Sequence, residues 1–285
     1  MSTKLMWLIH LLLGLAVIYI VIVSAAYFAQ TWLLFPTKLA EAGRPQLPAA
    51  AERLEVKASD GERLVGVRIP AASHASRRRP LLLGFGGNAW NAENTALYLH
   101  DVFPDADVVT FHYRGYRPSG GRPSAEALLA DSLAIFDHLQ TVPQQIVAVG
   151  FSIGTGVAAY LARHRPLAGL ILVTPFDSLE ALAREHYFWA PVGLLLRHRM
   201  ATLDWVGDVR APTALITARY DTIVPERRSA PLRRAIPNLV FDRTIEAGHN
   251  DLYDHPAFVA ALREAHGRIA AAAAGASGRA GGAEP

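Results

Sequence analysis

The segment Val147–Tyr160 reads VAVGFSIGTGVAAY, in which a short apolar strand, a serine flanked by glycines and an alanine-rich helix start follow one another directly. A chain that passes from a strand into a helix within two or three residues has room only for small side chains beside the turn. Gly150 and Gly154 meet this requirement, and Ser152 stands between them. The pattern therefore predicts an α/β fold that displays Ser152 at the carboxyl end of a strand.

Strands and helices alternate through the region 53–267. A hairpin is predicted around Asp60 and Gly61, and it is followed by the apolar runs PLLLGF, DVVTFHY, QIVAVGF, AGLILVT, PTALITA and LVFDRTI. Helical stretches are expected at 91–101, 124–140, 152–163, 226–235 and 252–267, with a mixed region at 178–199. This alternation predicts a mostly parallel sheet with helices on both faces.

The beginning of the chain is apolar enough to lie in a membrane. No Asp, Glu, Lys or Arg occurs from Leu5 to Thr37, and about 20 apolar residues suffice to span a bilayer core. The segment predicts one transmembrane helix. A cleaved secretory signal is the competing interpretation, but the apolar run exceeds the roughly 7 to 15 residues of a signal core. An interfacial aromatic belt is expected at Tyr27, Phe28, Trp32 and Phe35.

Four parts are predicted along the chain. They are a membrane anchor at 1–37, a Pro-containing linker at 38–52, a globular domain at 53–267 and a disordered Ala/Gly-rich tail at 268–285. The leading tail before the anchor is short, although basic residues on its two sides are nearly balanced. We therefore expect a single-pass protein with a cytoplasmic N-terminus and an exported, extracytoplasmic domain.

Charge and cysteine content exclude several kinds of function. The 28 basic and 25 acidic residues leave a net charge of +3, which is too small to indicate a nucleic-acid partner. The basic run Arg77–Arg79 is interpreted as a solvated loop. The chain has no cysteine, so it has neither a disulfide framework nor a thiolate nucleophile. Its histidines lack the paired spacing of a zinc site, and no metal or other cofactor is expected.

An aspartate and then a histidine follow two later predicted strands. A serine hydroxyl is a weak nucleophile at neutral pH, so it needs a general base that is itself oriented by an acid. Asp221 follows the run PTALITA, and His249 follows LVFDRTI. Because ligand sites of parallel sheets lie at the carboxyl ends of their strands, Ser152, Asp221 and His249 are predicted to form a catalytic triad. The alternative is a turn-capping Asp221 and a His249 without a role.

An acyl-transfer site also needs donors for the negative charge that develops on the attacked carbonyl oxygen. Loss of one such donor typically costs about 3 to 4 kcal/mol of barrier. The amide of Ile153, at the start of the helix after the serine, is one predicted donor. Asn88, in the loop that follows PLLLGF, is the other.

The longest stretch between strands, from Thr174 to Ala211, is rich in aromatic and aliphatic residues. Phe188 and Trp189 are predicted to cover the site as part of an apolar cap, and Trp90 is predicted to form a wall of the substrate pocket. The alternative is that these side chains pack a helix onto the sheet.

Four motifs together resemble one family, over roughly Glu52–His266. They are GGNAWN, HYRGYRPSGGRPS, GFSIG and AGHND. The chain resembles the α/β-hydrolases, and within them the membrane-anchored serine hydrolases of the BEM46 and ABHD13 type. The resemblance implies an α/β-hydrolase fold and activity through Ser152. Two positions depart from the group: Gly86 stands where His is common, which removes a ring that braces the loop, and Arg117 replaces a usual Gly.

The expected function is that of a serine hydrolase that cleaves a carboxylic ester or thioester through an acyl-enzyme on Ser152. A peptidase or amidase with the same triad and a non-catalytic, membrane-tethered binding module are the alternatives. The expected partners are a small acyl ester, thioester or amide and the lipid bilayer. Gly84-x-Gly86-x-x-Ala89 imitates a dinucleotide-binding fingerprint, but the next strand ends in His112-Tyr113, not in the acidic residue that a ribose requires.

Overall fold

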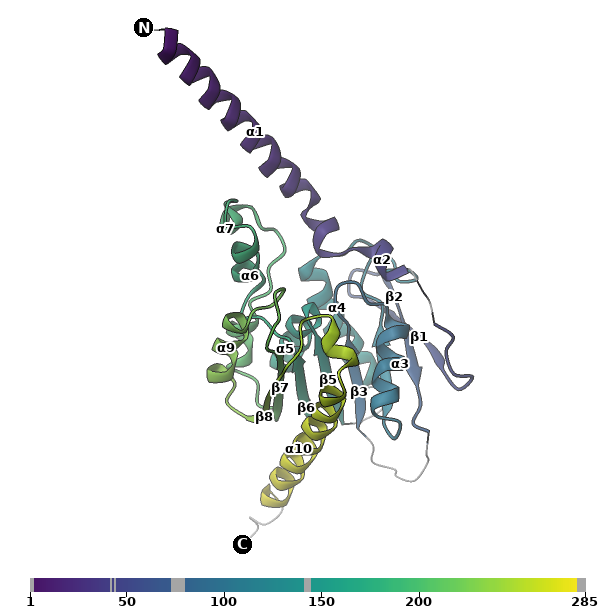
Figure 1. Cartoon of the computed structure of the whole chain (residues 1–285). Helices are drawn as coiled ribbons and strands as arrows, with labels where there is room; N and C mark the ends of the chain where they lie inside the picture. Colours follow the sequence, from purple (N-terminus) through teal and green to yellow (C-terminus); the bar gives the residue numbers. More distant parts are fainter. Residues whose placement is uncertain (1–2, 42, 44, 73–79, 141–144, 281–285) are drawn as a thin grey trace.

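The computed structural model describes residues 3–41, 43, 45–72, 80–140 and 145–280 (Figure 1). The basic run at 77–79 lies outside these residues. The described chain forms a single sheet with the strand order β1-β2-β4-β3-β5-β6-β7-β8. The strands are β1 (Glu52–Lys57), β2 (Arg63–Ile69), β3 (Leu81–Phe85), β4 (Asp107–Phe111), β5 (Ile146–Phe151), β6 (Gly169–Val173), β7 (Thr213–Ala218) and β8 (Leu239–Ile245).

The sheet is parallel from β4 through β3 to β8, and antiparallel only where β2 pairs with β1 and β4. Strands β3, β5, β6 and β7 are buried at every position, because helices cover both faces of a parallel sheet and its strands are continuous apolar runs. The predicted mostly parallel sheet is confirmed. The hairpin expected around Asp60 and Gly61 is the β1–β2 pair.

Helices pack on both sides of the sheet. In chain order, the described helices, including the projecting α1, are α1 (Thr3–Leu34), α2 (Thr37–Glu41), α3 (Ala92–Val102), α4 (Ala125–Leu139), α5 (Ile153–His164), α6 (Leu179–His186), α7 (Val192–Leu195), α8 (Thr202–Val206), α9 (Glu226–Ala235), the 3-10 turn Asp251–Asp254 and α10 (Pro256–Ala280). One apolar cluster joins the sheet to α4, α5 and α8, and a second joins it to α3 and α10. Asn91, Ser124 and Ser178 cap α3, α4 and α6 with side-chain oxygens.

The C-terminal segment differs from the predicted disordered tail over its described part. Helix α10 continues to Ala280, so 268–280 is helical, and 281–285 lie outside the described residues. Alanine has the highest helix propensity, and the run 270–274 is entirely alanine. Ile269 also holds this part of the helix to the domain, because it is 2% exposed and packs against Gly169, where a Cβ would approach it to 2.2 Å.

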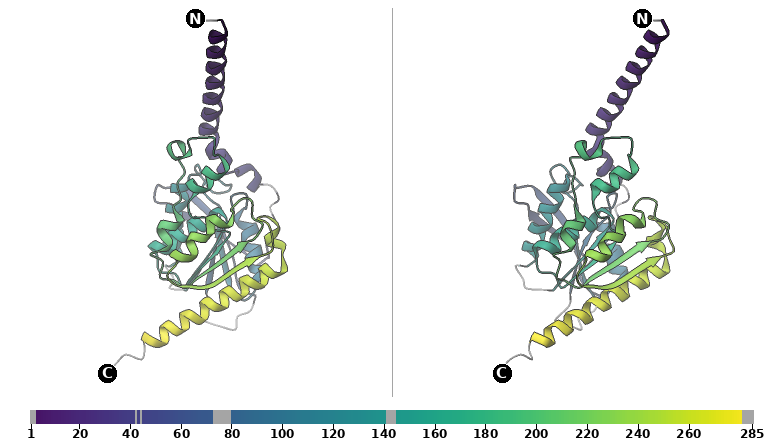
Figure 2. Two further views of the ribbon diagram at one scale, coloured as in Figure 1. Left: turned by 60° about the vertical axis from the view of Figure 1, so that its left-hand side comes forward. Right: turned by 90° about the vertical axis from the view of Figure 1, so that its left-hand side faces the viewer.

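Helix α1 projects away from the domain, as Figures 1 and 2 show. It is long and apolar enough to cross a membrane by length and composition. The residue expected to close the aromatic belt lies elsewhere: Phe35 is 1% exposed, and its ring meets that of His198 edge-on at 5.2 Å. Phe35 is thus a core residue, because the chain turns back onto the domain directly after α1.

Candidate active site

The turn between β5 and α5 holds Ser152 in a strained conformation. Its φ of 50° and ψ of −116° lie where side chains other than glycine are rarely found, and such strain concentrates at functional sites. A Cβ at Gly150 would lie 2.5 Å from the Gly154 carbonyl oxygen, and one at Gly154 would lie 2.2 Å from that of Phe85. The two glycines are therefore required by close backbone approach on either side of the serine.

Ser152, His249 and Asp221 lie within hydrogen-bond distance in series. The Ser152 Oγ is 3.2 Å from His249 Nε2, and His249 Nδ1 is 2.7 Å from Asp221 Oδ2. The second carboxylate oxygen, Oδ1, accepts hydrogen bonds from the amides of Ile223 at 2.9 Å and Val224 at 2.7 Å. Asp221 is buried and held from both oxygens, so its carboxylate can orient the imidazole toward the serine.

The loop after β3 approaches the serine from the other side. A Cβ built on Gly87 would lie 3.9 Å from the Ser152 Cβ, which places the GGNAWN loop beside the candidate nucleophile. Ile153 is the first residue of α5, so its amide belongs to the helix N-terminus, where backbone N–H groups favour negative charge. Both predicted oxyanion donors, Ile153 and Asn88, thus lie on the segments that flank Ser152.

Two tyrosines that the sequence analysis missed hold this loop. The Tyr113 hydroxyl donates to the Gly86 carbonyl at 2.7 Å, and the Tyr116 hydroxyl donates to the Asn88 carbonyl at 2.7 Å. These bonds orient the peptide planes around the predicted donor and brace the loop without the His that Gly86 replaces. A Cβ at Gly86 would in addition lie 2.6 Å from the Thr95 Oγ1. In the sequence, the two tyrosines of the HYRGY motif are the feature that indicates this bracing role.

A buried arginine secures the segment that carries these tyrosines. Arg114 Nε lies 3.0 Å from one Asp131 oxygen and its Nη2 lies 2.5 Å from the other, and its Nη1 pairs with Asp60. Such a bidentate pair fixes the direction of the guanidinium as well as its position. The 112–124 segment is thereby tied to α4 and to the β1–β2 turn.

Comparison with known proteins agrees with this fold. Residues 81–193 match a family model described as alpha/beta hydrolase fold. The uncharacterized protein Rv2307c of Mycobacterium tuberculosis is 36% identical over 193 residues, which cover 65% of this chain and 67% of that protein. The chain belongs to the α/β-hydrolase family. The predicted resemblance is confirmed.

Other relatives of this α/β-hydrolase carry more informative names. Protein bem46 of Schizosaccharomyces pombe is 29% identical over 70% of the chain and 72% of its own length. The lysophosphatidylserine lipase ABHD12 of Danio rerio is 30% identical over 51% of the chain and 44% of its own length. Among solved structures, the Pyrococcus furiosus esterase Pf2001 has a TM-score of 0.63 at 18% identity, over 76% of this chain and 92% of that one. The structural likeness bears on the fold alone.

The residues predicted to bind substrate in this α/β-hydrolase lie in two places. Trp90 packs 5.3 Å from Phe151 and 4.7 Å from Tyr253, measured between ring centroids. Burial raises the pKa of the Tyr253 hydroxyl to about 12, and the nearby Asp221 charge adds to this increase, so the phenol is neutral. Trp90 is thus seated in an aromatic cluster next to the β5 end that carries Ser152.

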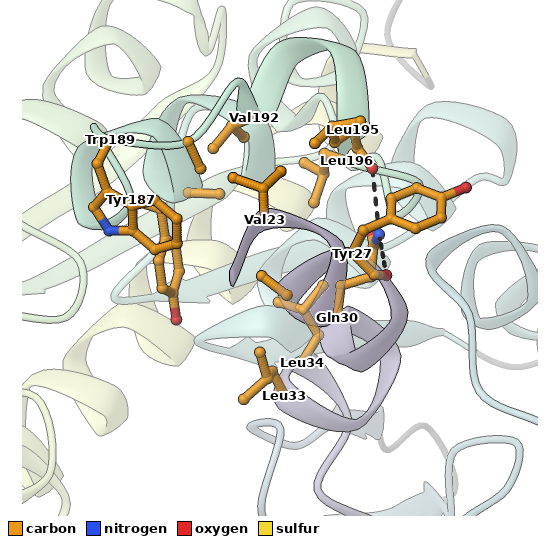
Figure 3. A pocket seen from close by; sticks show the side chains of 13 residues that line it. Val23, Tyr27, Gln30, Leu33, Leu34, Tyr187, Trp189, Val192, Leu195 and Leu196 are labelled. Carbon is orange, nitrogen blue, oxygen red and sulfur yellow. Dashed lines mark hydrogen bonds between the residues drawn. The ribbon is translucent and has the colours of Figure 1, made fainter. Parts of the chain in front are cut away.

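The other two predicted residues belong to the cap, which comprises α6, α7 and the residues around α7, over 179–196. Trp189 lines an apolar pocket that this segment forms with α1 (Figure 3). Phe188 is 86% exposed and does not line this pocket. From α1 the pocket is lined by Val23, Ala26, Tyr27, Gln30, Leu33 and Leu34, and from the cap by Ala183, Tyr187, Trp189, Ala190, Val192, Leu195 and Leu196. The cap therefore meets the membrane-type helix directly.

Metal ligation has no candidate in the described part of the chain. No group of three or more His, Cys, Asp or Glu side chains within residues 3–41, 43, 45–72, 80–140 and 145–280 is arranged to hold a metal ion. The dinucleotide-like glycines also have structural uses here. Gly84 lies within β3, where a Cβ would meet the Leu99 side chain at 2.7 Å, so it permits α3 to pack closely.

Proposed function

We propose that this hydrolase cleaves carboxylic esters or thioesters by acyl transfer to Ser152. His249 removes the hydroxyl proton as the Ser152 oxygen attacks the carbonyl carbon, and the resulting oxyanion is bound by the amides of Ile153 and Asn88. His249 then gives that proton to the leaving alcohol or thiol as the tetrahedral intermediate collapses. A covalent acyl-serine ester remains.

The second half returns the enzyme to its starting state. A water molecule, deprotonated by His249, attacks the acyl-serine carbonyl, and the proton passes from His249 to the Ser152 oxygen as the acid product leaves. Asp221 stays ionised throughout and holds the imidazole in the tautomer whose Nε2 can accept a proton. The observation that carries this proposal is the pair of contacts from Ser152 Oγ through His249 to Asp221.

The name of one similar protein supports ester chemistry. ABHD12 is named a lysophosphatidylserine lipase, and this name describes ester hydrolysis. Helix α1 supports a location next to lipid, because it has the length and composition of a membrane span. We therefore propose a single-pass protein, with a cytoplasmic N-terminus and an exported domain as predicted above, that acts on acyl esters near the bilayer.

The first test labels the full-length protein with a fluorophosphonate, which reacts with an activated serine. The wild-type protein is expected to be labelled and to hydrolyse p-nitrophenyl butyrate. Ser152→Ala is expected to lose both properties while it keeps the same circular-dichroism spectrum. A folded wild-type protein that is neither labelled nor active would instead favour the membrane-tethered binding module.

The acid is tested by Asp221→Asn. An amide in place of the carboxylate leaves the imidazole in the wrong tautomer, and a loss of about 10⁴-fold in kcat is expected from this cause. Wild-type turnover by this variant would refute the assignment of Asp221. A peptide p-nitroanilide assayed beside the ester separates the peptidase or amidase alternative, because only that alternative predicts that the amide is cleaved with comparable kcat/KM.

A further inference from the structure

Helix α1 has two parts with different surroundings. Its residues from Thr3 to Ile22 are all exposed, although the Tyr19 hydroxyl donates to the Trp189 carbonyl at 2.9 Å, and partial burial by the domain begins at Val23. The exposed part corresponds to about 30 Å at 1.5 Å per residue, which matches a bilayer hydrocarbon core of about 30 Å. In the single-pass arrangement proposed above, the remaining part, 23–34, lies at the membrane surface, and it packs against the domain.

Polar contacts attach this second part of α1 to the segment after α7. The Gln30 amide nitrogen donates to the Leu195 carbonyl at 3.2 Å, and its oxygen accepts from the Arg197 amide at 2.8 Å. The Thr31 hydroxyl lies 2.8 Å from His198 Nε2. These side chains lie more than 160 residues apart in sequence, so α1 is a fixed element of the folded domain rather than a loose tether.

The pocket between α1 and the cap is apolar (Figure 3). The side chains in its lining that carry polar atoms are those of Gln30, Tyr27, Tyr187 and Trp189. The side-chain nitrogen and oxygen of Gln30 are taken up by the backbone bonds to Leu195 and Arg197. Ala26 from α1 and Ala190 from the cap leave space between the two walls. A polar substrate group would find no free partner at Gln30, whereas a hydrocarbon chain would be favourably buried.

Each wall of the pocket is linked by a hydrogen bond to a loop of the candidate active site, although Ser152, Asp221 and His249 do not line the pocket. Leu34, the last residue of α1, accepts a hydrogen bond at 3.5 Å from the side-chain amide of Asn88 in the oxyanion loop. On the cap side, His186 at the end of α6 donates to the Ile223 carbonyl at 2.8 Å, two residues from Asp221. The pocket is thereby connected to the loops on the two sides of Ser152.

We propose that this pocket holds the acyl chain of a long-chain lipid ester drawn from the adjoining leaflet, with α1 as one wall of the binding site. Along α1 the lining runs from Val23 to Leu34, about 17 Å at 1.5 Å per residue, which is close to the thickness of one leaflet, about 15 Å. At the cap tip, Phe188 and Leu194 are 86% and 87% exposed, which suits contact with lipid. This substrate class rests on the hydrolase activity proposed above.

The test is a size substitution in the pocket with a neighbouring control. Ala26→Trp fills the pocket from α1, whereas Ala25→Trp places the same side chain at an exposed position of the same helix. Full-length proteins in detergent micelles are assayed with p-nitrophenyl palmitate and p-nitrophenyl butyrate. Each buried methylene contributes about fourfold to binding, so Ala26→Trp is expected to lower the palmitate-to-butyrate ratio of kcat/KM at least about tenfold. Ala25→Trp is expected to leave that ratio within about twofold of the wild type.

A second variant tests the same pocket from its other wall, so that the test does not depend on the folding of Ala26→Trp alone. Ala190→Trp enters the pocket from the cap and is expected to lower the ratio in the same direction. An unchanged ratio in folded Ala26→Trp and Ala190→Trp proteins, or an equal decrease in Ala25→Trp, would overturn the proposal. Failure of the proposed function gives a different result, because the wild-type protein would then cleave neither ester.

Discussion

At the scale of single residues, the candidate site depends on groups that set direction as much as on groups that react. Asp221 is held by two backbone amides, and the loop that carries Asn88 is held by the hydroxyls of Tyr113 and Tyr116. An oxyanion donor is effective only if it is aimed before charge develops. The tyrosine hydroxyls are therefore positioning groups for the proposed reaction.

Tyr116→Phe tests this role. Removal of the hydroxyl frees the Asn88 carbonyl, and a net hydrogen-bond contribution of about 0.5 to 1.5 kcal/mol corresponds to a decrease of about twofold to tenfold in kcat. KM for p-nitrophenyl butyrate is expected to be unchanged, because the donor acts on the transition state. Tyr160→Phe, at a tyrosine that packs against Trp205, is the matched control. A rise in KM at constant kcat would contradict the positioning role.

At the scale of elements, the β5–α5 junction decides where the serine stands. Helix α5 approaches β3 so closely that Gly154 faces the backbone of Phe85 and Gly86. Backbone atoms in the middle of a sheet cannot move aside as a flexible side chain can, so this contact sets how near the helix may lie. The position of the Ile153 amide relative to the Asn88 loop follows from it.

Gly154→Ala is expected to lower both stability and activity. Its Cβ would lie 2.2 Å from the Phe85 oxygen, and overpacking of this kind typically costs about 1 to 3 kcal/mol of unfolding free energy, occasionally more. Gly267→Ala in α10 is the control, because its Cβ would meet nothing within 4 Å and alanine favours a helix by about 1 kcal/mol. Urea denaturation of the two variants measures the difference. A Gly154→Ala protein as stable as wild type would show that α5 can shift without cost.

At the scale of the whole molecule, α1 and the domain form one unit through the Phe35–His198 region. Phe35 is enclosed in the main apolar cluster, and His198 is buried between Thr31 of α1, the Phe35 ring and the amide of Ala125. Burial, with the nearby Arg197 charge, lowers the pKa of His198 below its ordinary value. The neutral imidazole is therefore the form that the folded protein accommodates.

This depressed pKa predicts acid sensitivity. An unfolded histidine has a pKa of about 6.5, so above that pH His198 is neutral in both states and the folded state keeps its full stability. Below it the unfolded chain binds a proton that the folded chain resists, and stability falls as the pH drops toward the folded pKa. Burial lowers the pKa of His266 in the same direction.

Denaturant titrations between about pH 7.5 and pH 5 check this prediction. The unfolding free energy of the wild-type protein is expected to decrease over this range, and the decrease is expected to be smaller in His198→Asn and His266→Asn. A wild-type stability that stays constant down to pH 5 would contradict it. The measurement is made on the full chain in detergent, so that the contact between Thr31 and His198 is present.

Local pattern was sufficient for the fold and for the prediction that Ser152, Asp221 and His249 lie close together. The buried strands are recognised as continuous apolar runs that alternate with helical stretches. Each of the three residues follows a strand of the parallel sheet, so their convergence at one edge follows from topology. The helix over 268–280 also follows from local sequence, because alanine favours helices. The overall Ala/Gly-rich composition of this segment instead led to the prediction of disorder.

Tertiary structure decided what depends on partners distant in sequence. The burial of Phe35, the bonds from Tyr113 and Tyr116 to the oxyanion loop, and the pocket that Ala26 and Ala190 share across more than 160 residues leave no periodic trace in the chain. Periodicity shows that a side chain is buried or exposed along its own element, whereas the identity of its neighbour depends on how separate elements pack. Composition was thus sufficient to identify the apolar helix as a candidate membrane span, whereas its position as one wall of the pocket depends on packing against the cap.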